Sequence, residues 1–128
     1  MRLDYESDTP IFAQIAEGIK DAVLSGAFTE ETQVPSITDF SVQYKINPAT
    51  VLKGINMLVD EEILYKKRGI GMFVSTGAKA MLTAARKGAF YERFISGMID
   101  EAKRLGISRA ELEEMLEKYW KGDTQNER

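Results

Sequence analysis

Val34-Pro35-Ser36-Ile37, Asn47-Pro48-Ala49-Thr50-Val51-Leu52-Lys53 and Lys67-Arg68-Gly69-Ile70-Gly71-Met72-Phe73-Val74 are the three stretches that decide the fold of this chain. The first predicts a helix start, because a proline disfavours helical dihedral angles in the residue before it and serine is a good N-cap. The second repeats the device with an Asn-Pro pair. The third, with two glycines among β-forming residues, predicts a hairpin. Together they predict a winged helix-turn-helix.

The hairpin is expected to pair residues 63–66 with residues 72–75 and to carry Arg68 at its tip. Its Gly-x-Gly fragment does not predict a nucleotide site, because the dinucleotide fingerprint needs a third glycine that opens a helix and the Walker loop needs Gly-Lys-Ser/Thr. An arginine at a hairpin tip beside a groove-reading helix suits a minor-groove or phosphate contact.

The helix that starts after Asn47 has two different sides. Lys53 has no acidic residue three or four positions away, whereas an ordinary exposed helix is often dense in Glu/Lys pairs. Short residues near the helix start and a longer cation one turn later suit insertion into a major groove. We expect a buried stripe of Val51, Ile55, Leu58 and Val59, and an outer face of Ala49, Thr50, Lys53 and Met57.

Upstream, residues 9–25 predict a scaffold helix. Thr9 is the expected N-cap, Pro10 occupies the first helical position, and Gly26 supplies the end. Its apolar stripe is Ile11, Ile15, Ile19 and Val23.

The charge distribution restricts any DNA-binding role to a local face. The 128 residues carry a formal net charge of −3, which argues against binding nucleic acid over the whole surface. Yet every charged residue between Ile63 and Tyr91 is Lys or Arg, and no acid lies between Phe40 and Val59. We therefore expect a two-sided surface potential. Alternatively, these cations are ordinary solvated surface charges. This alternative applies least to Lys67 and Arg68, the pair that precedes Gly69.

Cysteine and histidine are both absent. This excludes disulfides and removes the usual transition-metal ligands and the commonest general base at neutral pH. We expect no enzymatic activity, no catalytic residues, no metal site and no cofactor. A signal-peptide pattern and a bilayer-spanning apolar run are also missing, so we expect a cytoplasmic protein without a membrane partner.

The C-terminal third predicts a helical hairpin. Gly106 ends one helix, and the capping box Ser108 to Glu111 starts the next. Two helices alone bury little apolar surface against the entropy of ordering them, so bulky aromatic residues indicate packing against a second copy. We expect a dimer interface made of Phe90, Tyr91, Phe94, Ile95, Met98, Ala102, Leu105 and Trp120.

From Thr9 to Val74 the chain resembles the DNA-binding domain of GntR-family bacterial transcription regulators. The resemblance rests on Pro10-Ile11, Gln14-Ile15, Val34-Pro35-Ser36, Asn47-Pro48-Ala49-Thr50-Val51 and Arg68-Gly69-Ile70-Gly71-Met72-Phe73-Val74, which stand at the family's positions. The short C-terminal region resembles the YtrA-type subfamily, whose C-terminal helices dimerise the protein. The resemblance implies a homodimer on an inverted-repeat operator, with one helix in the major groove and the wing tip in the minor groove.

Two positions depart from the family pattern. The family commonly has Arg two residues after the motif serine, where this chain has Thr38, and Lys53 stands where the recognition helix usually has Arg. Lysine is a point charge and lacks the fork that grips guanine. The residues expected to contact DNA are Ser36, Thr38, Asn47, Ala49, Thr50, Lys53, Lys67, Arg68 and Gly69.

The sequence thus predicts a mainly α-helical protein with a small β wing. Residues 1–76 are expected to form the winged helix-turn-helix domain, and residues 77–128 a helical dimerisation region. The expected function is that of a homodimeric, sequence-specific transcription regulator, a repressor, bound to double-stranded DNA at a pseudo-palindromic operator. The alternative is a winged-helix protein-interaction module without DNA binding. A small effector between the helices of the dimer stays open, and no residue identifies it.

Overall fold

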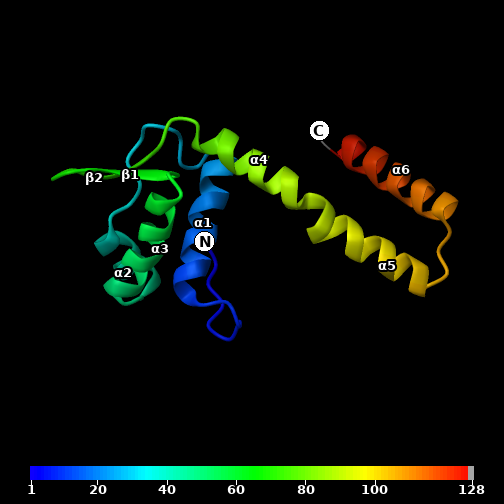
Figure 1. The fold of residues 1–128 in the computed structure, drawn as a ribbon, viewed down its shortest axis with the longest axis horizontal. Helices are drawn as coiled ribbons and strands as arrows, with labels where there is room; N and C mark the ends of the chain where they lie inside the picture. Colours follow the sequence, from blue (N-terminus) through cyan, green and yellow to red (C-terminus); the bar gives the residue numbers. More distant parts are fainter. Residues whose placement is uncertain (127–128) are drawn as a thin grey trace. The chain divides into compact units, whose positions relative to one another are not determined.

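The computed structural model describes residues 1–126 and is mainly helical, with one two-stranded antiparallel sheet (Figure 1). The chain forms two compact units, Met1–Ala85 and Arg86–Arg128. The elements are α1 (Ile11–Ser25), α2 (Ile37–Tyr44), α3 (Pro48–Asp60), β1 (Leu64–Lys67), β2 (Gly71–Val74), α4 (Ala78–Phe90), the π-helical turn η1 (Tyr91–Ile95), α5 (Ser96–Arg104) and α6 (Arg109–Asn126).

The core of the first unit forms where α3 packs on α1. Apolar side chains of both helices are no more than 1% exposed there: Ile15, Ile19, Val51, Ile55 and Leu58. The expected apolar stripes are therefore confirmed, with Val59 half-buried at the edge of the core. A Cβ at Gly54 would lie only 2.6 Å from the carbonyl oxygen of Phe12, so a glycine at this position allows the two helices to approach closely.

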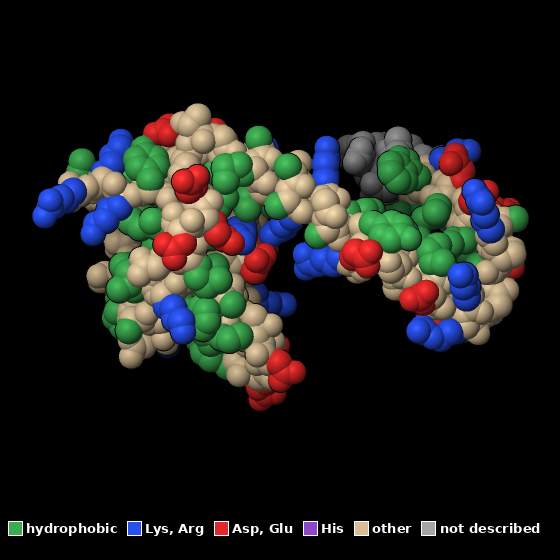
Figure 2. Space-filling model, viewed as in Figure 1, with side chains coloured by type: hydrophobic (Ala, Val, Ile, Leu, Met, Phe, Trp, Pro, Cys, Tyr) green, Lys and Arg blue, Asp and Glu red, His purple; other side chains and the backbone are tan. Residues whose placement is uncertain are grey.

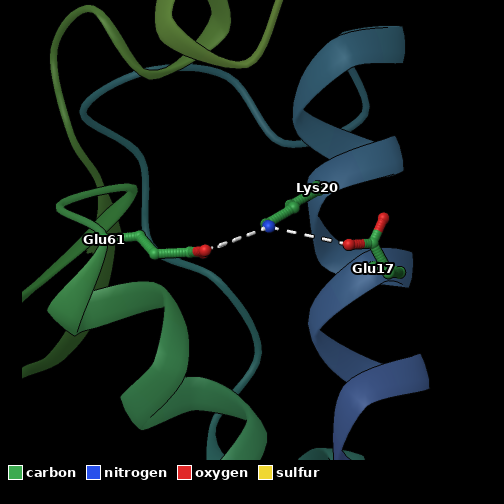
Figure 3. A network of polar contacts seen from close by, with 3 residues as sticks. All are labelled: Glu17, Lys20 and Glu61. Carbon is green, nitrogen blue, oxygen red and sulfur yellow. Dashed lines mark hydrogen bonds and ion pairs between the residues drawn. The ribbon is translucent and has the colours of Figure 1, made fainter. Parts of the chain in front are cut away.

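An ion pair joins the same two helices at the surface. The ammonium of Lys20 lies 3.1 Å from Glu61, the C-cap residue of α3, and 3.6 Å from Glu17 on its own helix (Figure 3). The Lys20 side chain is 17% exposed, while Glu61 is about half exposed. Partly solvated pairs of this kind contribute about 1 kcal/mol or less, so apolar packing holds α1 on α3.

The prediction that Thr9 caps the first helix is wrong by one residue. Pro10 is the N-cap, because its ψ of 150° is extended and the helix begins only at Ile11. In the part of the chain that the structure describes, no side chain caps α1; the side-chain amide of Gln14 instead donates to the carbonyls of Asp4 and Thr9 and accepts from the Asp4 N–H at 2.8 Å. The arm before α1 is thereby tied down.

Both caps expected in the helix-turn-helix are confirmed. Ser36 accepts from the Asp39 N–H, and the Asp39 carboxylate accepts from the Ser36 N–H, each at 3.0 Å. Asn47 Oδ1 accepts from the Ala49 N–H at 2.8 Å and starts α3. Between the helices, Lys45 adopts left-handed dihedral angles. The two caps that the sequence predicts therefore set where α2 and α3 begin.

The wing is the β1–β2 hairpin, and each strand is shifted by one residue from its expected position. The register pairs Leu64 with Val74 and Lys67 with Gly71, which is as far as the ladder extends before the turn. A third segment runs beside β2: the Val34 N–H donates to Met72 and the Val74 N–H donates to Thr32. The hairpin is therefore braced along one edge by the connector that leads into α2.

The first unit extends to Ala85, past the domain boundary that the sequence predicts after residue 76. The division into a DNA-binding domain and a dimerisation region stays a prediction. Ala78 and Leu82 of α4 are buried in its core. The carboxylate of Glu30 accepts from the N–H groups of Gly77 and Lys79, at 2.8 and 3.2 Å, and so caps α4 from a distant part of the chain. The sequence pattern did not predict this cap, because its two partners are far apart in sequence.

In the second unit, α5 and α6 form the expected hairpin. The Ile107 N–H donates to Ala102 and the Gly106 N–H to Lys103, a Schellman motif that ends α5. The predicted capping box is confirmed, since Ser108 Oγ accepts from the Glu111 N–H at 3.1 Å and Glu111 accepts from the Ser108 N–H. Within residues 1–126 we find no helix whose length and apolar character would let it cross a bilayer.

Candidate nucleic-acid interface

The exposed side of α3 carries most of its predicted site residues. Asn47, Ala49 and Lys53 are exposed, and Thr50 is half-buried. The expectation that Met57 belongs to this face is wrong, because its side chain packs against the core. Leu52, 42% exposed, and the exposed Asn56 lie on the outside instead and were not singled out from the sequence.

Lys53 is held against an aromatic ring of the neighbouring helix. Its Nζ atom lies 4.0 Å from the centroid of the Phe12 ring on α1. A cation over a ring face at this distance makes a cation–π contact, worth about 0.5–1 kcal/mol when exposed. The contact restricts the orientation of a side chain that would otherwise sample many rotamers.

The start of α2 brings Ser36 and Thr38 together on the surface, and both are exposed. The Ser36 oxygen already accepts from the Asp39 N–H, so its hydroxyl proton is left as the donor for an outside group. The Asp39 carboxylate occupies the first turn, where a phosphate would otherwise be attracted. A DNA contact at this helix start therefore depends on side-chain hydroxyls more than on the helix dipole.

The wing tip is a tight turn that presents cations. The Ile70 N–H donates to the Lys67 carbonyl at 2.9 Å, and Gly69, the third residue of the turn, has a φ of +77°. Arg68 and Lys66 are exposed, and Figure 2 shows Lys and Arg side chains gathered around this end of the hairpin, at the left of the view. The tip thus projects positive charge.

Lys67 differs from its neighbour Arg68 because it lies along the hairpin. Its Nζ is 4.2 Å from the ring centroid of Phe73 and 5.9 Å from that of Tyr65, and these two rings stack on each other. Because Lys67 already has aromatic partners, Arg68 is the better-placed cation for reaching a DNA groove.

Gln33 is a wing contact that the sequence did not reveal. Its Nε2 donates to the Ile70 carbonyl at 3.0 Å, and its backbone bridges to Phe73. A glutamine in a polar connector carries no pattern that would single it out. Its role follows only from the way the connector lies along β2.

The α3 segment has acidic residues only at its far end. Asp60, Glu61 and Glu62 follow the far end of the helix, about 20 Å from its start for 13 residues at 1.5 Å each. Residues 40–59 hold Lys45 and Lys53 and no acid. The exposed start of α3 therefore carries no acid of its own, although the Tyr5 hydroxyl, which donates to the Tyr44 carbonyl, brings the arm with Asp4 and Glu6 to the turn before it. Among the described residues, no group of three or more Asp or Glu is arranged to hold a metal ion.

One carboxylate joins the wing to Thr76, two residues before α4. Glu31 accepts hydrogen bonds from the hydroxyls of Thr76 and Tyr65. The Thr76 hydrogen bond, followed by that of Tyr65, lowers the pKa of Glu31, and the same contact raises the pKa of Tyr65. The Glu31 carboxylate is therefore favoured in its charged form.

The second unit exposes much of its apolar surface, visible over α5 and α6 in Figure 2. Among the predicted interface residues, Ala102 is buried, Ile95 and Met98 are half-buried, and the other five are exposed. An apolar cleft of about 430 Å³ lies between α5 and α6. The exposed large apolar residues of this unit are Phe90, Tyr91, Phe94, Leu105, Met115, Leu116, Tyr119 and Trp120.

Comparison with known proteins agrees with this geometry. The model of the family described as bacterial regulatory proteins, gntR family, matches residues 12–74. The chain is 28% identical over 116 residues to the HTH-type transcriptional repressor YtrA of Bacillus subtilis, a match that covers 91% of this chain and 88% of YtrA.

Two solved structures are also similar. A GntR-family transcriptional regulator from Bacteroides thetaiotaomicron has a TM-score of 0.72 and 34% identity, covering 88% of this chain and 98% of that one. The DNA-binding domain of AraR, solved in complex with operator ORR3, has a TM-score of 0.52 and 28% identity, covering 59% of this chain and 90% of that one.

Proposed function

The chain belongs to the GntR family of bacterial transcription regulators, and from that premise we propose that it is a repressor that binds a pseudo-palindromic operator as a homodimer. The observation that carries the proposal is the placement of two groups in one compact unit: the acid-free outer face at the start of α3 and the cationic tip of the β1–β2 wing. The relative named YtrA is a repressor, and the AraR domain was solved on its operator.

In the proposed complex α3 lies in the major groove. Ala49 at its start lets the backbone approach the base edges, and Thr50 contributes a hydroxyl. Lys53, one turn later, supplies a cation for a guanine or a phosphate. Since lysine lacks the fork of arginine, we expect it to discriminate bases less sharply.

The wing serves the neighbouring minor groove. Arg68 at the tip is exposed, and Gly69 beside it adds no side chain to obstruct the approach. Basic side chains in a narrow minor groove gain from its negative potential. Lys67, together with Ser36 and Thr38 at the start of α2, is assigned to backbone contacts that fix the register on the duplex.

A second copy of this chain would cover the apolar surface of the second unit. Aromatic and Met side chains that are more than half exposed are typical of protein interfaces. Two-fold pairing through this surface would give a dimer with two recognition helices, and half-sites about 34 Å apart, one helical turn, would match it.

The test is selection of bound fragments from a random duplex library, followed by footprinting and titration at several salt concentrations. The proposal expects a recovered motif with inverted-repeat symmetry, and log affinity that falls linearly with log salt. A chain that binds no duplex at low salt, or binds without salt dependence, would overturn it in favour of a protein-interaction module.

A further inference from the structure

We propose that Gln33 is a positioning residue for DNA binding: it holds the wing-tip turn in the conformation that presents Arg68. The inference rests on the proposed function and assigns a role to a residue outside both the recognition helix and the wing. Gln33 lies in the connector before α2, and its side chain is exposed.

The first step is the position of the connector beside the wing. The hydrogen bonds of Val34 to Met72 and of Val74 to Thr32, at 2.9 and 3.1 Å, place Gln33 between two backbone contacts along β2. Its own backbone bridges to Phe73. The backbone of Gln33 is thus held along β2, and its side chain extends from there toward the wing tip.

The second step is what the side chain does there. The Ile70 N–H is already bonded to the Lys67 carbonyl, and Gln33 Nε2 bonds the Ile70 carbonyl at 3.0 Å. Both backbone polar groups of Ile70 are therefore satisfied within the protein. Since Arg68 lies in the turn that Ile70 closes, holding Ile70 also restricts the backbone that carries Arg68.

The third step is the close fit between Gln33 and Gly71. A Cβ at Gly71 would lie 2.5 Å from Gln33 Nε2, and Gly71 has a φ of +150°. A side chain at this position would displace the amide from the turn. The glycine that ends the turn is therefore matched to the glutamine that braces it.

The brace matters because a two-stranded hairpin is only marginally stable by itself. A mobile tip would lose conformational freedom when Arg68 enters a groove, and that entropy would be subtracted from the binding free energy. A tip that is already held in place avoids the loss. Gln33 should therefore affect affinity through Arg68 and not through a contact of its own.

The experiment measures binding to the duplex recovered by the wild-type protein from a random library. Gln33→Met keeps the side-chain length and removes the donor, and Gln43→Met makes the same change at an exposed site on α2. The affinity of Gln33→Met should fall about three- to tenfold, as expected for loss of one hydrogen bond. The Gln43→Met variant should stay within about twofold of wild type, because substitutions at exposed sites away from specific contacts usually change the free energy little.

Two further readouts separate positioning from a general loss of structure. In an Arg68→Ala background, Gln33→Met should cost less than about twofold, because the residue that it positions is gone. In the free protein, Gln33→Met should speed hydrogen exchange at the Ile70 amide and leave exchange in α3 unchanged.

The outcomes are distinct. Unchanged affinity of Gln33→Met, or an equal loss with and without Arg68, would overturn the positioning role while leaving the proposed function in place. Failure of the wild-type protein to bind any duplex would instead overturn the proposed function, and the inference with it. Unchanged exchange at Ile70 would show that the turn does not need the brace.

Discussion

The Nζ of Lys53 on α3 lies 4.0 Å from the centre of the Phe12 ring on α1, so the scaffold helix helps to orient a side chain of the proposed recognition helix. The backbone approach at Gly54, beside the Phe12 carbonyl, brings the two helices close enough for this contact. Phe12 on the scaffold helix would thereby contribute to the proposed DNA binding.

We predict that Phe12→Leu weakens operator binding about two- to fivefold, the equivalent of one exposed cation–π contact. Phe12→Tyr keeps the ring and should bind like the wild type. In a Lys53→Met background, Phe12→Leu should have no further effect on affinity. Fluorescence anisotropy measures all four variants, and an equal loss in both backgrounds would mean that Phe12 acts through packing alone.

We predict that Arg68 contributes to operator binding through an electrostatic interaction that salt weakens. Arg68→Ala should weaken operator binding by about 1–3 kcal/mol and reduce the slope of log affinity against log salt by about 1. Lys103→Ala removes a cation from an exposed site of α5 and should leave the slope unchanged. If Arg68→Ala retains both affinity and slope, the wing tip does not contact DNA.

Local sequence signals predicted those parts of the fold that depend on neighbouring residues. Ser36, Asn47 and the Ser108 to Glu111 box cap helices as expected, because a cap and the N–H that it accepts lie within three residues. The strand ends were displaced by one residue, since periodicity does not show where a hydrogen-bond ladder stops.

Contacts between distant segments were not predictable in the same way. The Gln33 contact with Ile70 spans 37 residues, and the Glu30 cap on Gly77 spans 47. The contact of Lys53 with Phe12 depends on how α3 crosses α1, which no local pattern encodes. Eight of the nine predicted DNA-contacting residues are exposed and Thr50 is half-buried, but their contact with DNA stays a prediction, and the sequence did not indicate what holds them.

Glu31 should make stability depend on pH in the acidic range. Its hydrogen bonds to Thr76 and Tyr65 lower its pKa below the ordinary value of about 4.5. A carboxyl with a lowered folded-state pKa contributes stability that is complete above the unfolded-state pKa and is lost as pH falls through the folded-state pKa. The contribution should therefore be complete at neutral pH, decline as the pH falls below 4.5, and be lost below the lowered folded-state pKa.

Glu31→Gln tests this expectation by thermal unfolding followed across pH. The variant should melt lower than the wild type at neutral pH, and the two curves should converge in acid. The effect of Tyr65 on stability has the opposite pH dependence. Because its pKa is raised, its contribution to stability is complete below the unfolded-state pKa and is lost as the pH rises through the folded-state pKa. Glu114→Gln removes a charge from an exposed site of α6, and a similar pH profile for it would deny Glu31 any special role.

Glycine at position 71 is predicted to be required for the wing. Gly71→Ala places a Cβ 2.5 Å from Gln33 Nε2 and should destabilise the protein by about 1 kcal/mol or more while weakening operator binding. Gln33→Ala in the same chain removes the clashing amide and should recover part of the lost stability, although φ at +150° remains unfavourable for alanine. Urea denaturation measures Gly71→Ala, Gln33→Ala and the double variant, and strictly additive losses would show that the new methyl group at position 71 and the Gln33 amide do not meet.

Dimerisation is predicted to depend on aromatic side chains of the second unit. Tyr119 is 78% exposed and Phe94 is 53% exposed, so a charge at either site costs little in a single chain but would be buried between two copies. Tyr119→Glu and Phe94→Glu should each weaken self-association by about 2 kcal/mol or more, seen by sedimentation as a shift to monomer, with unchanged helix content. Tyr5→Glu alters an aromatic of the first unit that is 65% exposed and should leave the dimer intact.

Because an inverted-repeat operator is held by two linked recognition helices, the monomeric variants should bind a full operator no better than a half-site. Dimers that persist in both variants would place the interface elsewhere on the chain.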